Sequence, residues 1–474
     1  MKKRLLAFIL ATSMLFSATA CSKDNAKKDE TQKEKTTTSE KSQKEEVKRP
    51  TASYADTAII YEVNVRQYTE EGTFNAFSKH LERLKDMGIN TLWFMPIYDI
   101  AEEGRKGSLG SYYAIKDYKT VNDEFGTMED FKALVDKAHE MGFKVMLDWV
   151  ANHTGWDHTW IKEHNDFYKK DDTGNIIWPE GTDWDDVAQL DYDNKDMRAA
   201  MIDAMKFWIT EVDVDGFRCD YASGVPADFW NEAREELNKV KEIYMLAEDG
   251  PESNALLISA FESDYSFGLY NTLVAVTTGS KHASDLQYDI APKLPAGSFK
   301  MNFIENHDKN SYDKSLEERF GKDAINALTT LIFTLKGAPL VYSGQEEGIT
   351  KTLAFFEKDL IPFGTYEYAP LITKLSSIKT NHAVLNNITG GDIEVLNTGN
   401  DDVLAFTRQN DEESITVVMN LSKKDATIDS DDFNITGDTL LHGDSDNAAL
   451  EENGDVELKK GTTIKAFEYY VICK

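Results

Sequence analysis

Short apolar runs alternate with amphipathic stretches from about residue 57 onward. The run 59–65 is typical of a strand, and 74–87 has the spacing of a helix that ends at Gly88. The same cycle then recurs along the chain. Further strands are predicted at 91–97, 144–150, 214–220, 243–248, 301–305 and 339–343, and helices at 128–141, 197–212, 228–240 and 323–335. These are seven clear strands, and a weaker one near 264–267 makes eight.

Strands that alternate with helices form right-handed βαβ units and therefore a parallel sheet. Eight such units close into a barrel, so the sequence predicts an α/β fold of the (β/α)8 TIM-barrel type over residues 51–382. A doubly wound open sheet is the alternative that the pattern alone leaves.

Two segments depart from this alternation. Residues 155–194, after the third strand, are polar, and a short insertion of this length predicts a lid or a small subdomain. Beyond about residue 383 the pattern changes to short β runs separated by turn residues, which predicts a C-terminal antiparallel β-sandwich domain over 383–474. The insertion holds tryptophans of which we expect most to pack within it and one or two to lie exposed near the cleft: Trp156, Trp160, Trp178 and Trp184.

The N-terminal stretch has the pattern of an export signal. Basic residues at 2–4 precede an apolar run at 5–16 and then small residues, which predicts a signal peptide over 1–20. Cys21 follows directly, which resembles a bacterial lipoprotein signal, where this cysteine carries the lipid. Ordinary cleavage after Ala20 is the alternative. We therefore expect a secreted protein that a lipid at Cys21 anchors to the membrane, at the bacterial cell surface.

Residues 21–50 are almost all charged or polar, which predicts a disordered tether. Residues 1–50 carry 12 of the 52 basic and 7 of the 83 acidic residues, so 40 basic and 76 acidic residues remain beyond them. A folded part this acidic repels phosphate backbones, which excludes nucleic acid as the expected partner. A neutral sugar polymer meets no such penalty.

Side chains capable of acid–base chemistry gather where the predicted strands end. Active-site groups of a parallel barrel lie at those carboxyl ends. Arg218 and Asp220 are two residues apart and so point to the same side, whereas Cys219 points into the helix layer. The other polar residues at strand ends are Asp148, Asn152, His153, Glu248, Asn306, His307 and Asp308.

Carboxylates, histidines and an arginine at one barrel mouth are the groups that glycoside cleavage requires. One carboxylate attacks the anomeric carbon, and a second, kept protonated, donates to the leaving oxygen. We expect Arg218 to hold Asp220 ionised and Glu248 to stay protonated. Asp148 is expected to be a buried partner of nearby groups.

The segments that carry these residues resemble the motifs of a known family. From about residue 57 to the C-terminus the chain resembles the α-amylase family of retaining α-glycoside hydrolases, which have TIM-barrel catalytic domains. The matching segments are 148–153, 216–220, 246–248 and 303–308, with two further ones at 189–192 and 337–346.

The resemblance implies a role for each matching residue. Asp220 would form the covalent glycosyl intermediate, Glu248 would act as acid and then as base, and Asp308 would stabilise the distorted sugar. Retention requires the first two carboxyls to lie about 5–5.5 Å apart. The substrate-binding positions implied in the same way are Tyr113, His153, Arg218 and His307.

One departure from the family pattern bears on metal binding. Many members have Lys and His three and four residues after the nucleophile, and the carbonyl of that His helps to bind calcium. Here these positions are Ser223 and Gly224. Asn152 is either a calcium ligand or a hydrogen-bonding group within the mouth. We therefore expect no metal site and no required cofactor, with calcium as the alternative.

The sequence thus predicts a monomeric hydrolase of α-1,4 links in starch, maltodextrin or related α-glucans. An exo-acting α-glucosidase, a cyclodextrin or pullulan hydrolase and a transglycosylase are alternatives within the same family. A non-catalytic glucan-binding lipoprotein and the solute-binding lipoprotein of a transporter are alternatives of another class. The last would lack the eight strands and the acids at their ends.

Overall fold

The computed structural model describes residues 49–249, 254–448 and 454–474. The predicted signal peptide at 1–20, the predicted lipidation site Cys21 and the tether up to residue 48 lie outside the described residues. Among the helices of the described part, none combines the length and the apolar character that crossing a bilayer requires.

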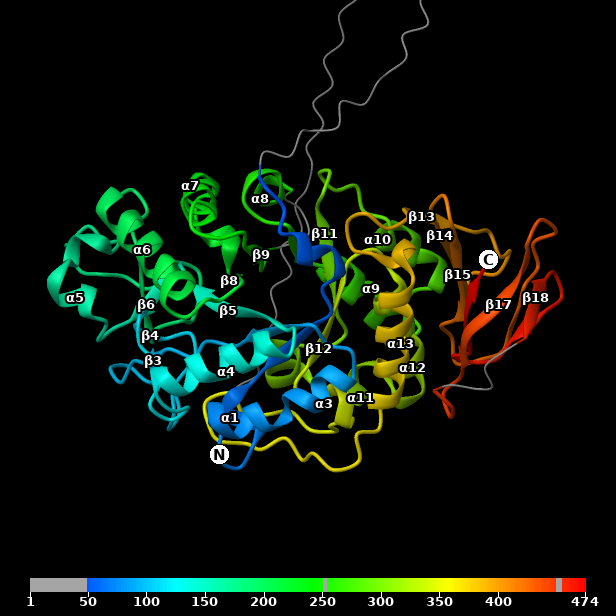
Figure 1. Ribbon diagram of the computed structural model, residues 1–474, viewed down its shortest axis with the longest axis horizontal. Coiled ribbons are helices and arrows are strands. Elements are labelled where there is room, and N and C mark those ends of the chain that lie inside the picture. The colour runs from blue at the N-terminus through cyan, green and yellow to red at the C-terminus, as the bar shows by residue number, and fades with distance from the viewer. Residues whose placement is uncertain (1–48, 250–253, 449–453) are drawn as a thin grey trace, which may run out of the picture. The chain divides into compact units, whose positions relative to one another are not determined.

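Most of the described chain forms a closed barrel of eight parallel strands (Figure 1). Neighbouring strands are hydrogen bonded in the order β1-β12-β11-β10-β9-β8-β5-β2, and β2 pairs again with β1. The barrel, including the weak strand expected near 264–267, is therefore confirmed. The strands are β1 (Ile60–Val63), β2 (Thr91–Phe94), β5 (Lys144–Val150), β8 (Gly216–Asp220), β9 (Tyr244–Ala247), β10 (Ser263–Tyr265), β11 (Phe299–Asn302) and β12 (Ala338–Tyr342).

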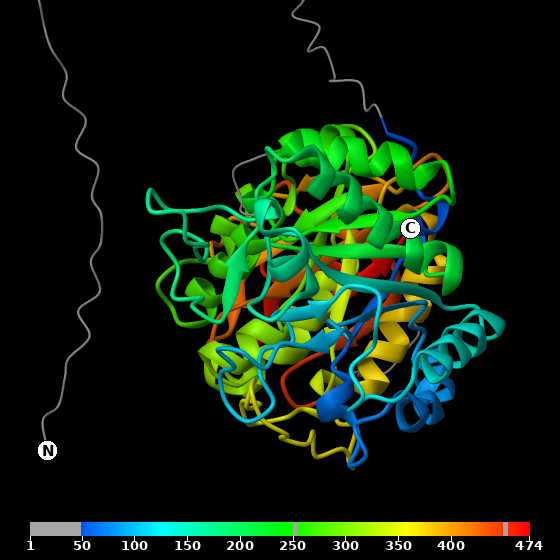
Figure 2. The same ribbon diagram turned by 90° about the vertical axis from the view of Figure 1, so that its left-hand side faces the viewer.

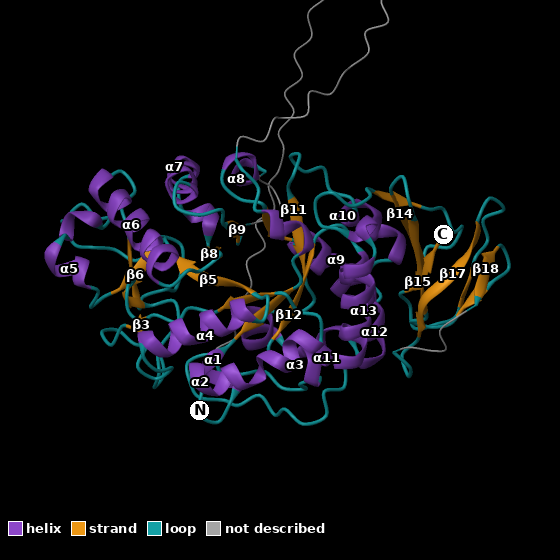
Figure 3. Ribbon diagram, in the orientation of Figure 1, coloured by secondary structure: helices purple, strands orange, loops and turns teal. Residues whose placement is uncertain are grey.

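Helices follow the strands and surround the barrel (Figure 3). Helix α4 begins with a capping box, in which Thr127 Oγ1 accepts from Asp130 N and the Asp130 carboxylate accepts from Thr127 N. The helix expected at 74–87 is divided into α2 and α3 by a 3-10 turn at Ser78–His80. The helices are α1 (Val65–Tyr68), α2 (Phe74–Phe77), α3 (Leu81–Asp86), α4 (Met128–Glu140), α5 (Thr159–Glu163), α6 (Lys195–Glu211), α7 (Ala227–Asn238), α8 (Ala255–Ser259), α9 (Phe267–Thr277), α10 (Gln287–Ile290), α11 (Leu316–Phe320), α12 (Ile325–Thr334) and α13 (Ala369–Asn381).

The seventh barrel strand ends earlier than its apolar run suggests. The sequence predicted a strand at 301–305, but β11 ends at Asn302. The carbonyl of Ile304 and the carboxylate of Glu305 accept hydrogen bonds from the side chain of Arg319 instead of pairing with a neighbouring strand. The chain therefore leaves the sheet before it reaches the polar residues at 306–308.

The loops after β2 and β5 form two small antiparallel ladders beside the barrel. β3 (Asp99–Ile100) pairs with β4 (Ile115–Asp117), and β6 (His153–Gly155) pairs with β7 (Val187–Gln189). β7 belongs to the predicted insertion after the third barrel strand. These elements lie at the left of Figure 1, the side that faces the viewer in Figure 2.

After α13 the chain forms an antiparallel β domain, as the sequence predicted. Its main sheet has six strands in the order β13-β14-β15-β20-β17-β18, and a second sheet pairs β16 with β19. A separate apolar cluster joins the two sheets, since it contains Ala426 of β16 and Ile464 of β19 together with Val418 and Ile472 of the main sheet. The strands are β13 (Ile393–Val395), β14 (Val403–Gln409), β15 (Ser414–Asn420), β16 (Ala426–Thr427), β17 (Asn434–Gly443), β18 (Asp455–Lys459), β19 (Thr463–Ile464) and β20 (Tyr469–Cys473).

A buried carboxylate fixes the amino-terminal end of β8. Asp215 accepts a hydrogen bond from Val145 N at 2.9 Å, and its carboxylate lies 2.7 Å from His139 Nε2 and 3.0 Å from the Nζ atoms of Lys144 and Lys241. Burial alone would raise the pKa of Asp215, but these donors hold it well below its ordinary value. The charge therefore ties β8 to β5 and α4.

We expect Asp215→Asn to destabilise the protein by about 1.5–3 kcal/mol at neutral pH, because Lys144 and Lys241 lose their charged partner and Val145 N loses its charged acceptor. Because the pKa is depressed, the stabilisation is fully present above the unfolded-state pKa of about 3.9 and is lost as the pH falls toward the lower folded-state value. Urea unfolding measured at pH 7 checks the size of the effect.

The matched control is Asp213→Asn, two residues away. The side chain of Asp213 is 64% exposed, and its left-handed backbone (φ 63°) suits asparagine. This change should cost less than about 0.5 kcal/mol. Equal losses for the two variants would contradict the role given to Asp215.

Candidate active site

One buried guanidinium at the barrel mouth contacts three carboxylates. Arg218 Nη1 donates to Asp148 Oδ1 at 2.8 Å and to Asp220 Oδ1 at 3.0 Å. Its Nη2 lies 2.9 Å from Glu248 Oε2, and its Nε donates to the Tyr265 hydroxyl at 3.0 Å. The predicted common side of Arg218 and Asp220 is confirmed. The same cation also reaches the residue that follows β9, so three strand ends meet at it.

Asp148 is a buried anchor for this cation. Its Oδ2 accepts from Trp93 Nε1 at 3.2 Å and from the Tyr113 hydroxyl at 3.1 Å, while Oδ1 accepts from Arg218. Both carboxylate oxygens therefore have protein partners, and the side chain is fully buried. The interpretation of Asp148 as a buried partner of nearby groups is confirmed.

A second group of charges surrounds His307. Its Nδ1 lies 2.5 Å from Glu62 Oε1, and its Nε2 lies 2.8 Å from the Tyr113 hydroxyl and 3.4 Å from Asp308 Oδ1. Burial disfavours the charged ring, but Asp308 and Glu62 outweigh it and raise the pKa of His307 to about 9. Burial instead lowers the pKa of His153 to about 4. At neutral pH the first ring is therefore a cation and the second is neutral.

Tyr221, directly after Asp220, has a strained backbone. Its φ of 40° and ψ of 50° are left-handed, which is rare for a bulky residue and common at functional sites. In this conformation the N–H of Tyr221 donates to Glu248 Oε2 at 2.9 Å. A Cβ added at Gly224 would lie 2.3 Å from the Tyr221 ring and 3.0 Å from Asn152 Oδ1, so only glycine leaves room for the ring. The turn after β8 thus orients Glu248.

These groups border a pocket of about 650 Å³ at the carboxyl ends of the strands. Arg218 lies buried behind it. The other predicted catalytic and binding residues all line it: Tyr113, His153, Asp220, Glu248, His307 and Asp308. The segments that follow the barrel strands complete the lining with Lys106, Ser111, Asp183, Trp184, Asp186, Val187, Tyr221, Tyr312, Phe355 and Phe356. Carboxylates beside aromatic faces suit a ligand with hydroxyl groups on an apolar ring.

The insertion contributes one tryptophan to the pocket, Trp184, whereas the exposed tryptophan, Trp178, does not line it. Trp184 is half-buried, and its ring lies edge-on to Tyr221 with centroids 5.4 Å apart. Trp160 packs against Tyr118, and Trp156 donates to the carbonyl of Asp185. Most of these side chains therefore support the segment.

Three carboxylates share one guanidinium, and this changes the expectation for Asp220. Burial raises the pKa of Asp220 well above its ordinary value, Glu248 and Asp148 add to the rise, and Arg218 opposes it. The direction of this pKa shift runs against the expectation that Arg218 holds Asp220 ionised, because burial outweighs the effect of the guanidinium. Burial raises the pKa of Asp148 as well. The cluster binds a proton more readily than an isolated ion pair would.

Several residues of the site were not predicted from the sequence. Glu62, Trp93 and Tyr265 lie in β1, β2 and β10, inside runs interpreted only as strands. A lone glutamate in an apolar strand is the signal that could have identified Glu62, because buried charges need partners. Tyr312 lies in a short π-helical turn at Lys309–Asp313 and Phe355 in a loop, and in such segments no hydrophobic period predicts which side chains reach the pocket.

The surroundings of Asn152 do not fit a calcium ion. Gln189 Nε2 donates to Asn152 Oδ1 at 3.0 Å and to its carbonyl oxygen at 3.1 Å. Calcium binds such oxygens, so an amide N–H group directed at both of them opposes a cation there. The second interpretation of Asn152, hydrogen bonding within the mouth, is the one that the contacts support.

Comparisons with known proteins agree with this geometry. The chain matches the sequence family described as "Alpha amylase, catalytic domain" over residues 34–186 and 181–425, and "Maltogenic Amylase, C-terminal domain" over 393–459. An alpha-amylase from Lactobacillus plantarum has a TM-score of 0.76 and 32% identity, with 89% of this chain and 99% of that chain covered. A noncanonic maltogenic alpha-amylase AmyB from Thermotoga neapolitana has a TM-score of 0.76 and 30% identity, with 88% and 99% covered.

Alpha-amylase MalA from Haloarcula japonica is 27% identical over 402 residues. The match covers 79% of this chain and 57% of that protein, so the chain spans little more than half the length of this relative.

The charge on His307 predicts an alkaline limit to the activity expected from the sequence. A raised pKa keeps the imidazolium present below about pH 9, and it is lost as the pH rises through that value. We expect kcat/KM on a neutral maltooligosaccharide to fall above about pH 9, measured across a pH series. Glu62→Gln removes one of the carboxylates that stabilise the cation and should move this limb to lower pH. A limb near the ordinary histidine pKa of about 6.5, or one that Glu62→Gln leaves in place, would contradict the assignment.

The contacts of Asn152 predict that activity survives chelation. Treatment with EDTA should leave the rate of glucan hydrolysis unchanged, since a hydrogen-bond donor occupies the oxygens that calcium would need. A calcium-requiring amylase treated in parallel serves as the control that the chelation worked. Loss of activity that added calcium restores would refute this expectation.

Proposed function

This chain belongs to the alpha-amylase family of glycoside hydrolases, and on that premise we propose that it hydrolyses α-1,4-glucosidic bonds. Its substrates are starch, maltodextrin or related α-glucans, and its mechanism is a retaining double displacement. The observation that carries the proposal is the contact of Arg218 with both Asp220 and Glu248 in a pocket that Asp308 also lines. A single cation thereby holds the two reacting carboxyls close to each other, so that they can flank the scissile glycosidic bond.

The two carboxyls divide the work of the first displacement. Asp220 attacks the anomeric carbon and forms a glycosyl ester, while Glu248 gives its proton to the leaving glycosidic oxygen. The proton held by the carboxylate cluster must therefore reside on Glu248 when the reaction begins. The N–H of Tyr221 and Nη2 of Arg218 fix the Glu248 carboxyl for this transfer.

The second displacement regenerates the protein. Glu248, now ionised, takes a proton from a water molecule. The oxygen of that water attacks the anomeric carbon, and the ester bond to Asp220 breaks. Asp308 binds ring hydroxyls, and Tyr113 stacks on the sugar. His307 brings a positive charge and His153 a neutral hydrogen-bonding ring, both directed at substrate hydroxyls.

Members of the same family differ in the glycosidic linkage that they cleave and in whether they cut within the glucan chain or at its end. Exo-acting α-glucosidase, cyclodextrin or pullulan hydrolase and transglycosylase activities use the same catalytic residues with different loops. Chromatography of the products from amylose, pullulan and maltotriose separates these activities. A non-catalytic glucan-binding protein is the alternative of another class, and the presence of all three acids in one pocket counts against it.

We also propose that the protein is exported and held at the outer face of the membrane by a lipid on Cys21. The support is the order of basic, apolar and small residues before this cysteine, followed by the polar stretch 22–48. A tether of that composition would let the barrel reach polymeric substrate away from the membrane.

Asp220→Asn should lower kcat by at least about 1,000-fold, or about 4 kcal/mol of transition-state stabilisation, because the amide cannot form the ester. Binding of a maltooligosaccharide, measured by calorimetry, should persist, since Asp308 and the aromatic lining remain. Asp213→Asn, in the segment that precedes β8 and away from the pocket, is the control and should hydrolyse as the unchanged protein does. Undiminished turnover in Asp220→Asn would dismiss the mechanism.

Cys21→Ser should release the protein from the membrane fraction into the medium, because the thiol that carries the lipid is gone. Immunoblots of the two fractions, with Cys473→Ser as the control that keeps Cys21, measure the change. A protein that is already free in the medium before the substitution would exclude the anchor and favour ordinary cleavage.

A further inference from the structure

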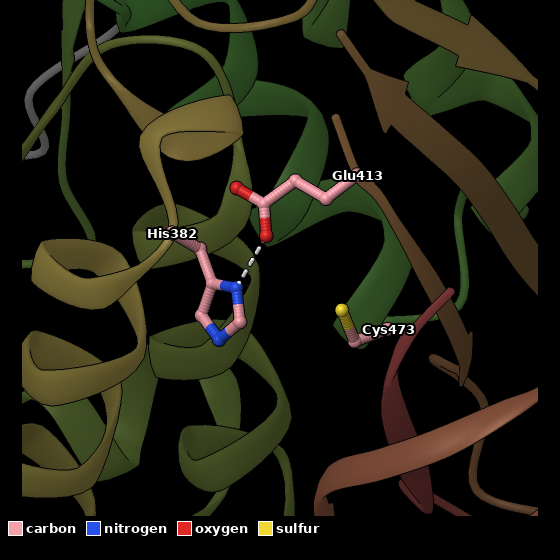
Figure 4. Close-up of side chains that lie close together, drawn as sticks. All are labelled: His382, Glu413 and Cys473. Atoms are coloured by element: carbon pink, nitrogen blue, oxygen red, sulfur yellow. Dashed lines mark hydrogen bonds and ion pairs between the residues drawn. The ribbon is translucent and has the colours of Figure 1, made fainter. Parts of the chain in front are cut away.

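A thiol, a carboxylate and an imidazole meet where the barrel adjoins the C-terminal sheet (Figure 4). His382 follows the end of α13, Glu413 lies in the turn between β14 and β15, and Cys473 is the last residue of β20. Their ligand atoms all lie within 4.8 Å of one another. From this arrangement we propose that His382, Glu413 and Cys473 bind a divalent cation of the zinc type.

Two of these side chains are already oriented toward each other. His382 Nδ1 lies 2.6 Å from Glu413 Oε2, and Val384 N donates to Glu413 Oε1 at 3.2 Å. The backbone N–H of Glu413 donates to the side chain of Asn410 at 2.9 Å, which fixes the turn. The side chains of His382 and Glu413 are 20% and 21% exposed. They are thus held in place yet remain within reach of an ion from solvent.

The third ligand stands on a paired strand. Cys473 lies opposite Ile415 of β15 and Asp438 of β17, and directly opposed residues point to the same face of a sheet. A second carboxylate, that of Asp438, is therefore on the same face as the thiol. Cys473 is free of any disulfide. The thiol thus has acidic neighbours on two sides, which favours a cation.

The ligand set selects the kind of ion. Thiolate, imidazole and carboxylate together are typical of zinc, whereas calcium and magnesium prefer oxygen ligands alone. One thiolate and one carboxylate also balance the two positive charges. Metal–ligand bonds of about 2.0–2.3 Å in a tetrahedron place the ligand atoms about 3.3–3.8 Å from one another. Side-chain rotations that move these atoms by about 1 Å therefore complete the site. Water takes the fourth position.

Binding moves protons in a defined way. The Cys473 thiol loses its proton to solvent and becomes the thiolate ligand. The proton on His382 Nδ1 passes through solvent to Nε2, so that the neutral ring binds the metal through Nδ1, the nitrogen that faces Glu413. His382 also lines a separate pocket of about 180 Å³ with Asn381 and Thr439, which gives an ion a path to the ring.

An ion at this position would link the catalytic barrel to the C-terminal domain. The two parts already meet through Arg408 of β14, which is buried and donates to the carbonyl of Leu335 after α12 at 3.1 Å. The proposed ion would add a bond between the end of α13, the turn between β14 and β15, and the last residue of β20. It lies outside the pocket of about 650 Å³ that holds the candidate active site, since none of its ligands lines that pocket. The site is therefore independent of the proposed hydrolysis.

The test uses cobalt as a spectroscopic stand-in for zinc. The full-length protein is reduced, stripped with EDTA and titrated with Co²⁺ and then Zn²⁺. We expect one equivalent of Co²⁺ to produce a thiolate-to-cobalt charge-transfer band, and Zn²⁺ to abolish it. Zn²⁺ should also raise the melting temperature of the stripped protein, whereas Ca²⁺ should not. A stripped protein that shows no band would overturn the proposal.

Variants assign the ligands. Cys473→Ser should remove the band, and His382→Gln and Glu413→Gln should each weaken Zn²⁺ binding by at least about tenfold in calorimetry. The matched control is His442→Gln, because His442 makes a similar contact with Glu468 at 2.8 Å in the same sheet and should not affect the ion. A band that persists in Cys473→Ser, or Zn²⁺ binding that His442→Gln weakens as much as His382→Gln does, would overturn the proposal.

Discussion

The barrel mouth depends on one buried cation. Arg218 is enclosed on all sides and holds Asp148, Asp220 and Glu248, which come from the ends of three neighbouring strands. Without it, the buried carboxylate of Asp148 and two further carboxylates beside it would lose their shared cation, and an uncompensated buried charge is strongly destabilising. With it, two of the three stay available to the pocket while Asp148 serves as the fixed partner. The need to pair this cation thus brings the reacting groups together.

The two ends of the same strand serve different purposes. Asp215, at the amino end of β8, pairs with His139, Lys144 and Lys241 and so holds strands together away from the pocket. At the carboxyl end, Arg218 pairs with three carboxylates from behind the pocket, and Asp220 lines the pocket. A barrel separates stability from chemistry in this manner because its loops at one end alone form the active site.

The sequence alone predicted the features of the fold and of the site that follow from local residue patterns. Eight alternating units imply a barrel, and a spacing of two residues places Arg218 and Asp220 on one side. The raised pKa of Asp220 was not predictable, because it follows from burial and from Glu248 and Asp148, which lie far from Asp220 in the chain. Glu62 reaches His307 across 245 positions of sequence, and no period encodes such a contact.

The sequence did not predict the long, mostly polar strand β17 or the approach of Cys473 to His382. Both depend on the register of the sheet, which joins residues far apart in the chain.

The most direct test of the central claim is the identity of the residue that carries the sugar. Mass spectrometry of protein quenched during turnover of a slowly hydrolysed α-glycosyl fluoride measures it. The account predicts one glycosyl group on the peptide that contains Asp220, and release of product with retained configuration. A glycosyl group on a different residue, or direct release of the inverted anomer with no labelled peptide, would contradict it.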